Sequence, residues 1–202
     1  MKTRTITFFV LLAAMISLKA QADTSLVLVK NIDSTIVEDV RYATTNNFTG
    51  QVLYPSSKVY LRLAAAEKLA EANKYLKENY NYRIKVFDGY RPLHVQKIMW
   101  QIMPDDRYVA DPKKGSKHNR GAAVDITLID STGTQLDMGT PYDNFTKKAH
   151  YTYTYLPQKV LDNRKLLHDT MIKFGFEPIS TEWWHFDLKG WSRFSILDEP
   201  AD

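Results

Sequence analysis

The chain has 202 residues, of which 44% are hydrophobic and 25% are charged, with a net charge of +4 and no cysteine. A chain of this length can bury a substantial hydrophobic core and fits one domain better than two. The lack of cysteine excludes disulfides, a thiol nucleophile and a thiol-linked lipid anchor.

The first 22 residues have the pattern of a secretory signal peptide. Two basic residues, Lys2 and Arg4, precede an apolar run that ends shortly before the small-residue triplet "AQA". The run has about thirteen residues, whereas a membrane-spanning helix needs roughly twenty. We therefore expect residues 1–22 to be a signal peptide, residues 23–202 to form the exported domain, and the product to be periplasmic without a membrane span.

Much of the positive charge belongs to this leader. Three of the 27 basic residues and none of the 23 acidic residues lie in it, so the rest of the chain carries a net charge of +1. No run of basic residues remains that would indicate a nucleic-acid-binding face. We expect no nucleic-acid partner, and the sequence indicates no obligate protein partner.

Regular elements follow in chain order. Residues 57–79 carry small and apolar residues at helical spacing, which predicts an amphipathic helix. Residues 82–88 alternate as a strand does, and "DG" then predicts a turn. A second helix is expected from Pro92 to about Met103, followed by a polar loop over residues 105–119. The inner face of this helix is expected to hold Val95, Ile98, Met99 and Ile102.

The second half of the chain mixes the two element types. "AAVDITLID" is typical of a strand, and "TGTQLDM" of a turn with a possible partner strand. A third helix is expected over residues 158–174, capped by Gly175, and "EWWHFDL" predicts the last strand. Because strands and helices do not alternate regularly, we expect a single α+β domain, in which helices pack on a small antiparallel sheet that carries the functional site.

Two segments supply residues that suit metal chemistry. In "SKHNRGAAVDITL", Asp125 lies within an apolar strand and His118 lies in the loop before it. Without further evidence, Asp125 would be interpreted as an ordinary half-exposed strand carboxylate and His118 as a solvated loop histidine. "TEWWHFD" adds Glu182 and His185. Hydrolytic zinc is commonly held by three such ligands with one position open for water. His118, Asp125 and His185 form such a set, and Glu182 remains as a carboxylate that could take a proton from the water.

Two other metal sites are less consistent with the sequence. A structural zinc site favours cysteine, which is absent. A ferrous oxygenase also uses two histidines and a carboxylate, but its first two ligands are usually two residues apart, whereas His118 and Asp125 are seven apart. An oxygenase reaction would also give Glu182 no evident role.

The sequence resembles the VanX-type D-alanyl-D-alanine dipeptidases, a branch of the zinc peptidases that also include D-Ala-D-Ala carboxypeptidases and hedgehog-type domains. The resemblance is carried by five blocks in the same order: "RYATTNNFTG", "FDGYRP", "SKHNRGAAVDITL", "DMGTPYD" and "EWWHF". The chain departs from this family after Asp143, in "NFTKKAHYTY", and in the short loop before Ser116. Both departures lie where a lid would cover the pocket, so they concern selectivity more than catalysis.

The resemblance implies a role for each matching residue. One zinc ion per chain would be bound by His118, Asp125 and His185, and Glu182 would be the general base and then the general acid. Arg91 would stabilise the oxyanion, as a fixed guanidinium can wherever amide hydrolysis builds negative charge on one oxygen. The residues implied to hold a small D,D-dipeptide substrate are Tyr42, Tyr54, Ser116 and Asp143.

The expected reaction is zinc-dependent hydrolysis of D-Ala-D-Ala to two D-alanines. Two alternatives remain open. One is a D,D-carboxypeptidase or endopeptidase that acts on peptidoglycan stem peptides through the same site. The other is a non-catalytic, hedgehog-like zinc protein, although the presence of both Glu182 and Arg91 argues against it.

Overall fold

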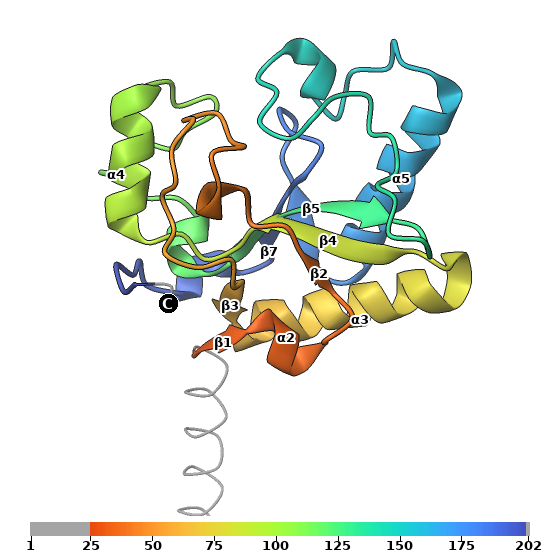
Figure 1. Ribbon diagram of the computed structural model, residues 1–202, viewed down its shortest axis with the longest axis horizontal. Coiled ribbons are helices and arrows are strands. Elements are labelled where there is room, and N and C mark those ends of the chain that lie inside the picture. Colours follow the sequence, from red (N-terminus) through yellow and green to blue (C-terminus); the bar gives the residue numbers. More distant parts are fainter. Residues whose placement is uncertain (1–24, 201–202) are drawn as a thin grey trace, which may run out of the picture.

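The computed structural model describes residues 25–200, and the predicted signal peptide lies outside these residues. The described chain is a single α+β domain, as predicted (Figure 1). Its strands are β1 (Leu26–Leu28), β2 (Val37–Glu38), β3 (Tyr60–Arg62), β4 (Arg83–Asp88), β5 (Ala123–Ile129), β6 (Phe176–Pro178) and β7 (His185–Leu188). Its α-helices are α2 (Val29–Ile32), α3 (Leu63–Tyr80), α4 (Leu93–Ile102) and α5 (Gln158–Lys173).

The main sheet has five strands in the order β2-β4-β5-β7-β6. It is mixed rather than antiparallel, because β2 pairs with β4 in parallel while the other neighbours are antiparallel. The predicted antiparallel pairing is confirmed for β4, β5, β7 and β6, and β2 departs from it. Between β2 and β4 the chain passes through β3 and α3, and a long crossover of this kind permits parallel pairing. β1 and β3 form a separate two-stranded sheet.

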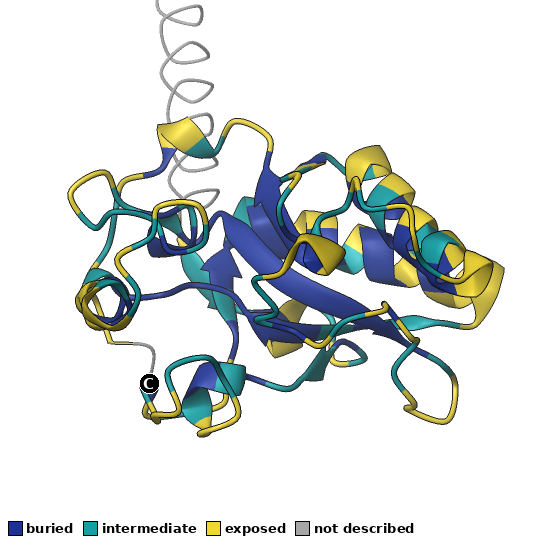
Figure 2. Cartoon of the chain, turned by 90° about the horizontal axis from the view of Figure 1, so that it is seen from above, coloured by how far each residue is buried: buried dark blue, intermediate teal, exposed yellow. Residues whose placement is uncertain are grey.

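Helix α3 lies along one side of the sheet, and long irregular segments lie on the other (Figure 1). It begins at Leu63, later than predicted, because residues 60–62 pair with β1 instead of entering the helix. Its side chains Leu69, Ala72 and Leu76 are fully buried. The buried residues are concentrated in the sheet and on the inward sides of the helices (Figure 2).

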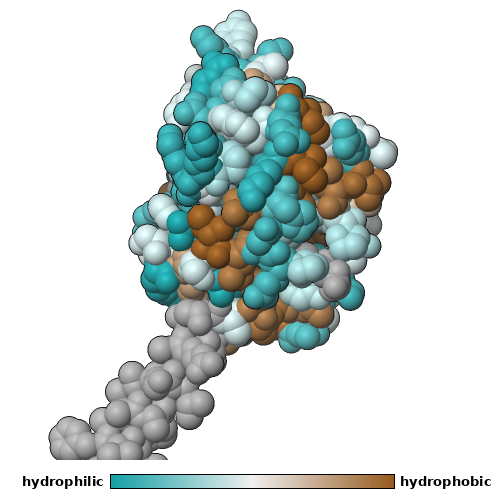
Figure 3. Space-filling view, turned by 90° about the vertical axis from the view of Figure 1, so that its left-hand side faces the viewer, coloured by the Kyte–Doolittle hydropathy of each residue, from teal (hydrophilic) through white to brown (hydrophobic). Residues whose placement is uncertain are grey.

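Helix α4 departs from its predicted inner face. Val95 and Met99 are buried as expected, but Ile98 and Ile102 are 36% and 42% exposed. A polar residue, Gln96, is fully buried instead. The helix lies on the side of the molecule that Figure 3 shows, where hydrophobic and hydrophilic side chains are interspersed. Within residues 25–200, no helix is both long enough and apolar enough to cross a membrane.

Candidate metal centre

Strand register places three chemically important side chains side by side. Asp125 on β5 is paired with Asp88 on β4 and with His185 on β7. Residues directly opposite one another in a sheet point to the same face. A register shift between Val86 and Asp88 sets two residues of β4 against one of β5, which turns Asp88 to the face of Asp125. The sheet therefore presents two carboxylates and an imidazole in one row.

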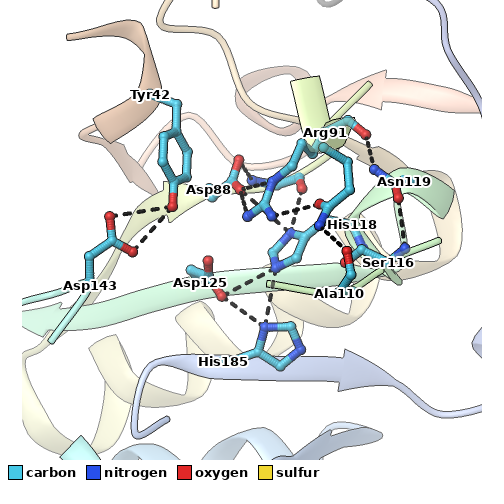
Figure 4. A network of polar contacts seen from close by, with 12 residues as sticks. Tyr42, Asp88, Arg91, Ala110, Ser116, His118, Asn119, Asp125, Asp143 and His185 are labelled. Atoms are coloured by element: carbon cyan, nitrogen blue, oxygen red, sulfur yellow. Dashed lines mark hydrogen bonds and ion pairs between the residues drawn. The ribbon is translucent and has the colours of Figure 1, made fainter. Parts of the chain in front are cut away.

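The second histidine comes from the turn that leads into β5. His118 opens a short 3-10 helix, His118–Arg120, and this helix ends at Gly121 with a φ of 65°. A Cβ atom there would lie 3.2 Å from the backbone nitrogen of Arg62, so both the conformation and the space favour glycine. The turn brings the imidazole of His118 over the row of side chains on the sheet (Figure 4).

The distances among the three predicted ligands fit a tetrahedral metal site. His118 Nε2 lies 3.2 Å from His185 Nδ1 and 3.3 Å from Asp125 Oδ1, and the last two atoms are 3.0 Å apart. Zinc–ligand bonds of 2.0–2.1 Å imply about 3.3 Å between two ligands of a regular tetrahedron. All three residues are buried. The predicted triad is thus assembled, with edges close to those that a zinc ion requires.

Hydrogen bonds on the outer sides of the imidazoles fix which ring nitrogens carry protons. His118 Nδ1 lies 2.7 Å from the Gly89 carbonyl, and His185 Nε2 lies 2.8 Å from Asp187 Oδ1. Both partners can only accept, so both outer nitrogens donate. In neutral imidazoles the inner nitrogens, His118 Nε2 and His185 Nδ1, present lone pairs toward the carboxylate of Asp125. Burial alone would lower the pKa of His185, but the carboxylates of Asp187 and Asp125 raise it well above its ordinary value. The space between these three atoms therefore favours a cation, either a proton or a metal ion.

Two residues that sequence reasoning did not identify support these ligands. Asp187 accepts from His185 and lies 3.4 Å from the Lys117 ammonium. Tyr142 donates from its hydroxyl to Asp125 Oδ2 at 2.9 Å, which leaves Oδ1 for the metal. Partners of this kind orient metal ligands and tune their basicity. The spacing of Asp187 was a usable signal, because residues 185 and 187 of one strand share a face.

Glu182 lies beside the triad without being part of it. Its Oε2 atom is 3.9 Å from His185 Nδ1, and its side chain is buried. Burial, together with the nearby carboxylates of Asp125 and Asp143, raises the pKa of Glu182 to about 8. A carboxylate that gains and loses a proton near neutral pH suits general acid–base catalysis.

Arg91 is held rigidly from two sides. Its Nε and Nη2 atoms donate to Asp88 Oδ2 at 3.0 and 2.5 Å, and its Nη1 atom donates to Gln96 Oε1 at 2.9 Å. Asp88 thus orients the guanidinium of Arg91. Tyr54 donates to the other oxygen of Asp88 at 2.7 Å. It therefore supports Arg91 from behind and is absent from the residues that line the cavity, which leaves its substrate-binding role a prediction.

A cavity of about 150 Å³ opens over the triad. Pockets for drug-sized ligands measure ~300–1,000 Å³, so this one suits a small ligand. The remaining predicted substrate residues, Tyr42, Ser116 and Asp143, all line it. Asp143 accepts from the Phe48 amide and from the Tyr42 hydroxyl at 3.1 and 3.2 Å. Burial raises the pKa of Asp143 to about 7. A cation that enters the cavity would therefore stabilise the ionised form of this carboxylate.

Aromatic rings from three segments meet at the cavity. The ring of Phe145 lies 4.9 Å from that of Tyr108 and 5.4 Å from that of Phe48. Phe48 in turn lies 6.2 Å from Tyr42. All four residues line the cavity. Loops far apart in the sequence thus enclose it together, which favours a short ligand over a long chain.

The loop that carries Asp143 is anchored from α5 by Arg164, another residue that sequence reasoning missed. Arg164 is 2% exposed, and its guanidinium donates to three backbone carbonyls, those of Met138, Lys148 and His150, at 2.7, 3.0 and 3.1 Å. These carbonyls lie on either side of Asp143 in sequence. One side chain therefore shapes the segment that closes this part of the cavity.

Comparison with known proteins is consistent with this geometry. Residues 22–198 match the peptidase family M15 described as D-ala-D-ala dipeptidase. The chain is 35% identical over 159 residues to the D-alanyl-D-alanine dipeptidase of Escherichia coli K12, covering 79% of this chain and 82% of that one. It is 30% identical to the D-alanyl-D-alanine dipeptidase of Enterococcus faecium, covering 75% and 85%.

Solved structures give weaker matches. VanYB in complex with D-alanine-D-alanine is 17% identical, with a TM-score of 0.46, over 69% of this chain and 77% of the other. The vancomycin resistance D,D-dipeptidase VanXYg, in complex with a D-Ala-D-Ala phosphinate analogue, is 18% identical, with a TM-score of 0.39, over 81% and 66%.

Proposed function

The chain belongs to the M15 family of D-Ala-D-Ala dipeptidases, and we propose that it hydrolyses D-Ala-D-Ala to two D-alanines with one zinc ion held by His118, Asp125 and His185. The observation that carries this proposal is the convergence of three buried ligand atoms, 3.0–3.3 Å apart, at distances that suit one zinc ion. Zinc bound there would act as a Lewis acid that polarises the peptide carbonyl and activates a water molecule.

The protein's own groups would divide the remaining work. Glu182 takes a proton from the attacking water and returns it to the leaving amine nitrogen, so the peptide C–N bond breaks as an amine and a carboxylate form. Arg91 donates N–H groups to the carbonyl oxygen as negative charge develops on it. Because Asp88 and Gln96 already fix the guanidinium, little reorganisation is needed at that moment.

The ends of the substrate would be held on opposite sides of the reacting bond. Asp143 is a buried carboxylate with a raised pKa, so an ammonium group is its natural partner. Tyr42, which donates to Asp143, keeps that carboxylate in place. Ser116 lines the cavity next to His118 and is available for the carboxylate end of the dipeptide. We further propose, from the signal-peptide pattern of residues 1–22, that the protein acts in the periplasm.

A substrate panel tests the proposal. The zinc-loaded protein, with and without chelator, would be offered D-Ala-D-Ala, L-Ala-L-Ala, N-acetyl-D-Ala-D-Ala and a stem pentapeptide that ends in D-Ala-D-Ala. We expect D-alanine release from free D-Ala-D-Ala alone, and loss of that release with chelator. Faster consumption of the pentapeptide would favour a carboxypeptidase. Failure to hydrolyse any of the four would favour a binding protein.

A further inference from the structure

We propose that Gln96 is a positioning residue that couples Arg91 to the wall loop, defined here as residues 104–115. The inference rests on the proposed function, in which Arg91 stabilises the oxyanion. It concerns a residue on α4 that touches neither the triad nor the cavity, so it would act through Arg91 and through the loop.

The side chain of Gln96 is fully buried and makes one hydrogen bond at each end. Its Oε1 atom accepts from Arg91 Nη1 at 2.9 Å, and its Nε2 atom donates to the Ala110 carbonyl at 2.8 Å. A guanidinium can only donate and a carbonyl can only accept. The orientation of the amide is therefore fixed chemically by its two partners.

The wall loop is held to the rest of the domain by the burial of Val109 and by the hydrogen bond from Gln96. The amides of Tyr108 and Val109 donate to the Asp105 carbonyl within the loop, so these bonds shape the loop without tying it to the rest of the domain. The bond from Gln96 ties it to α4. The loop supplies several residues that line the cavity, namely Asp106, Arg107, Tyr108, Val109, Ala110 and Gly115. Tyr108 also makes the aromatic contact with Phe145 from the opposite loop.

Arg91 depends on the same amide. A guanidinium has five N–H groups. Asp88 accepts two of them and Gln96 accepts a third, which leaves two for an oxyanion. Asp88 by itself fixes one edge of the guanidinium, and Gln96 fixes the other. A displacement of the wall loop would therefore be transmitted through one amide to the group that stabilises the transition state, and the loop can influence catalysis without contacting the reacting atoms.

Two substitutions at this position separate the two bonds. Gln96→Glu keeps an acceptor for Arg91, but a carboxylate beside that cation has no N–H to donate to the Ala110 carbonyl. Gln96→Met has nearly the same length and loses both bonds. Gln101→Glu is a matched control, because Gln101 is exposed on the same helix. Each protein would be zinc-loaded and given D-Ala-D-Ala, with thermal unfolding measured in parallel.

We expect Gln96→Glu to raise KM about fivefold or more while kcat stays within about threefold. Gln96→Met should raise KM similarly and also lower kcat by about tenfold or more, since small misplacements of catalytic groups can cost up to about 10² in rate. Gln101→Glu should change neither. Equal effects of the two Gln96 variants on kcat, or an unchanged kcat in folded Gln96→Met, would overturn the coupling.

Hydrogen exchange provides a measurement that does not depend on turnover. Amides of residues 105–111 should exchange at least about tenfold faster in Gln96→Glu than in Gln101→Glu, because the loop loses its bond to α4. Equal exchange in the two variants would overturn the tether, even if Gln96→Met failed to fold. If the unsubstituted protein did not hydrolyse D-Ala-D-Ala, the proposed function would fail, and the exchange comparison would still decide whether Gln96 holds the loop.

Discussion

Asp187 Oδ1 accepts a hydrogen bond from His185 Nε2 at 2.8 Å and thereby determines which ring nitrogen faces the triad. Without this partner the imidazole could rotate or adopt the other tautomer. We predict that Asp187→Ala weakens zinc affinity by about 10- to 100-fold, the usual effect of losing such an outer partner. Competition with a fluorescent zinc chelator would measure the change.

Glu177 offers the control for this substitution. It lies directly opposite Asp187 in the β6–β7 pairing and is exposed. Glu177→Ala removes a carboxylate from the neighbouring strand without touching His185, so zinc affinity should stay within about twofold of the original value. Equal losses in the two variants would mean that general negative charge, and not the bond to His185, supports the metal.

Glu182→Gln should separate catalysis from metal binding. Glutamine has nearly the same shape but cannot take a proton, and general acid–base catalysis contributes about 10²–10⁴-fold. We therefore expect kcat for D-Ala-D-Ala to fall by at least about 10², while zinc affinity changes little because Glu182 stands outside the triad. Near-normal turnover by the zinc-loaded variant would show that another group acts as the base.

The triad could be predicted from sequence because its members lie in short, distinctive segments. His118 and Asp125 flank one turn, and His185 begins a strand rich in aromatic residues. The distances among them could not be predicted, because they arise from the pairing of β5 with β7 and from the tight turn at Gly121. In the structure the three ligand atoms lie close enough together to bind one ion.

The residues that support the site were harder to predict, because their partners are distant in sequence or are backbone atoms. No local sequence pattern indicates the hydrogen bond from Tyr142 to Asp125 or the bonds from Arg164 to three carbonyls. Helical periodicity also gave a wrong prediction for α4, where it predicted that Ile98 is buried. Periodicity shows that a helix has an apolar side, but not how much of that side other elements cover. The parallel pairing of β2 rests on two residues, too few for a recognisable pattern.

Arg164→Met tests whether the loop that carries Asp143 needs its anchor. The substitution leaves the carbonyls of Met138, Lys148 and His150 without a buried donor, and each unsatisfied group costs about 1–3 kcal/mol. We expect a loss of about 2–5 kcal/mol in the free energy of unfolding, measured by urea denaturation, and a higher KM. Lys165→Met is the neighbouring control, because Lys165 is exposed and pairs with Asp169 on the same helix. Comparable losses in both would contradict an anchoring role.

Asp143→Asn should stabilise the protein at high pH while weakening substrate binding. The pKa of Asp143 is raised from 3.8 to about 7, chiefly by burial, so between these pH values the folded state holds a proton that the unfolded state releases. Stability from this group is therefore greatest below pH 4 and is lost as the pH rises through 7. Asparagine has no such titration, and it tolerates the φ of 58° at this position.

The gain from Asp143→Asn relative to the unsubstituted protein should accordingly grow from pH 4 to pH 8, reaching at most about 4 kcal/mol at 1.36 kcal/mol per pKa unit. Urea denaturation at each pH would measure it, and the pH dependence of metal binding cancels because both proteins share the triad. Asp162→Asn, an exposed change on α5, should show no such trend. KM for D-Ala-D-Ala should rise at least tenfold in Asp143→Asn, since the substrate ammonium loses its carboxylate. A stability difference that stayed flat from pH 4 to pH 8 would mean that burial does not raise the pKa of Asp143 in the folded protein.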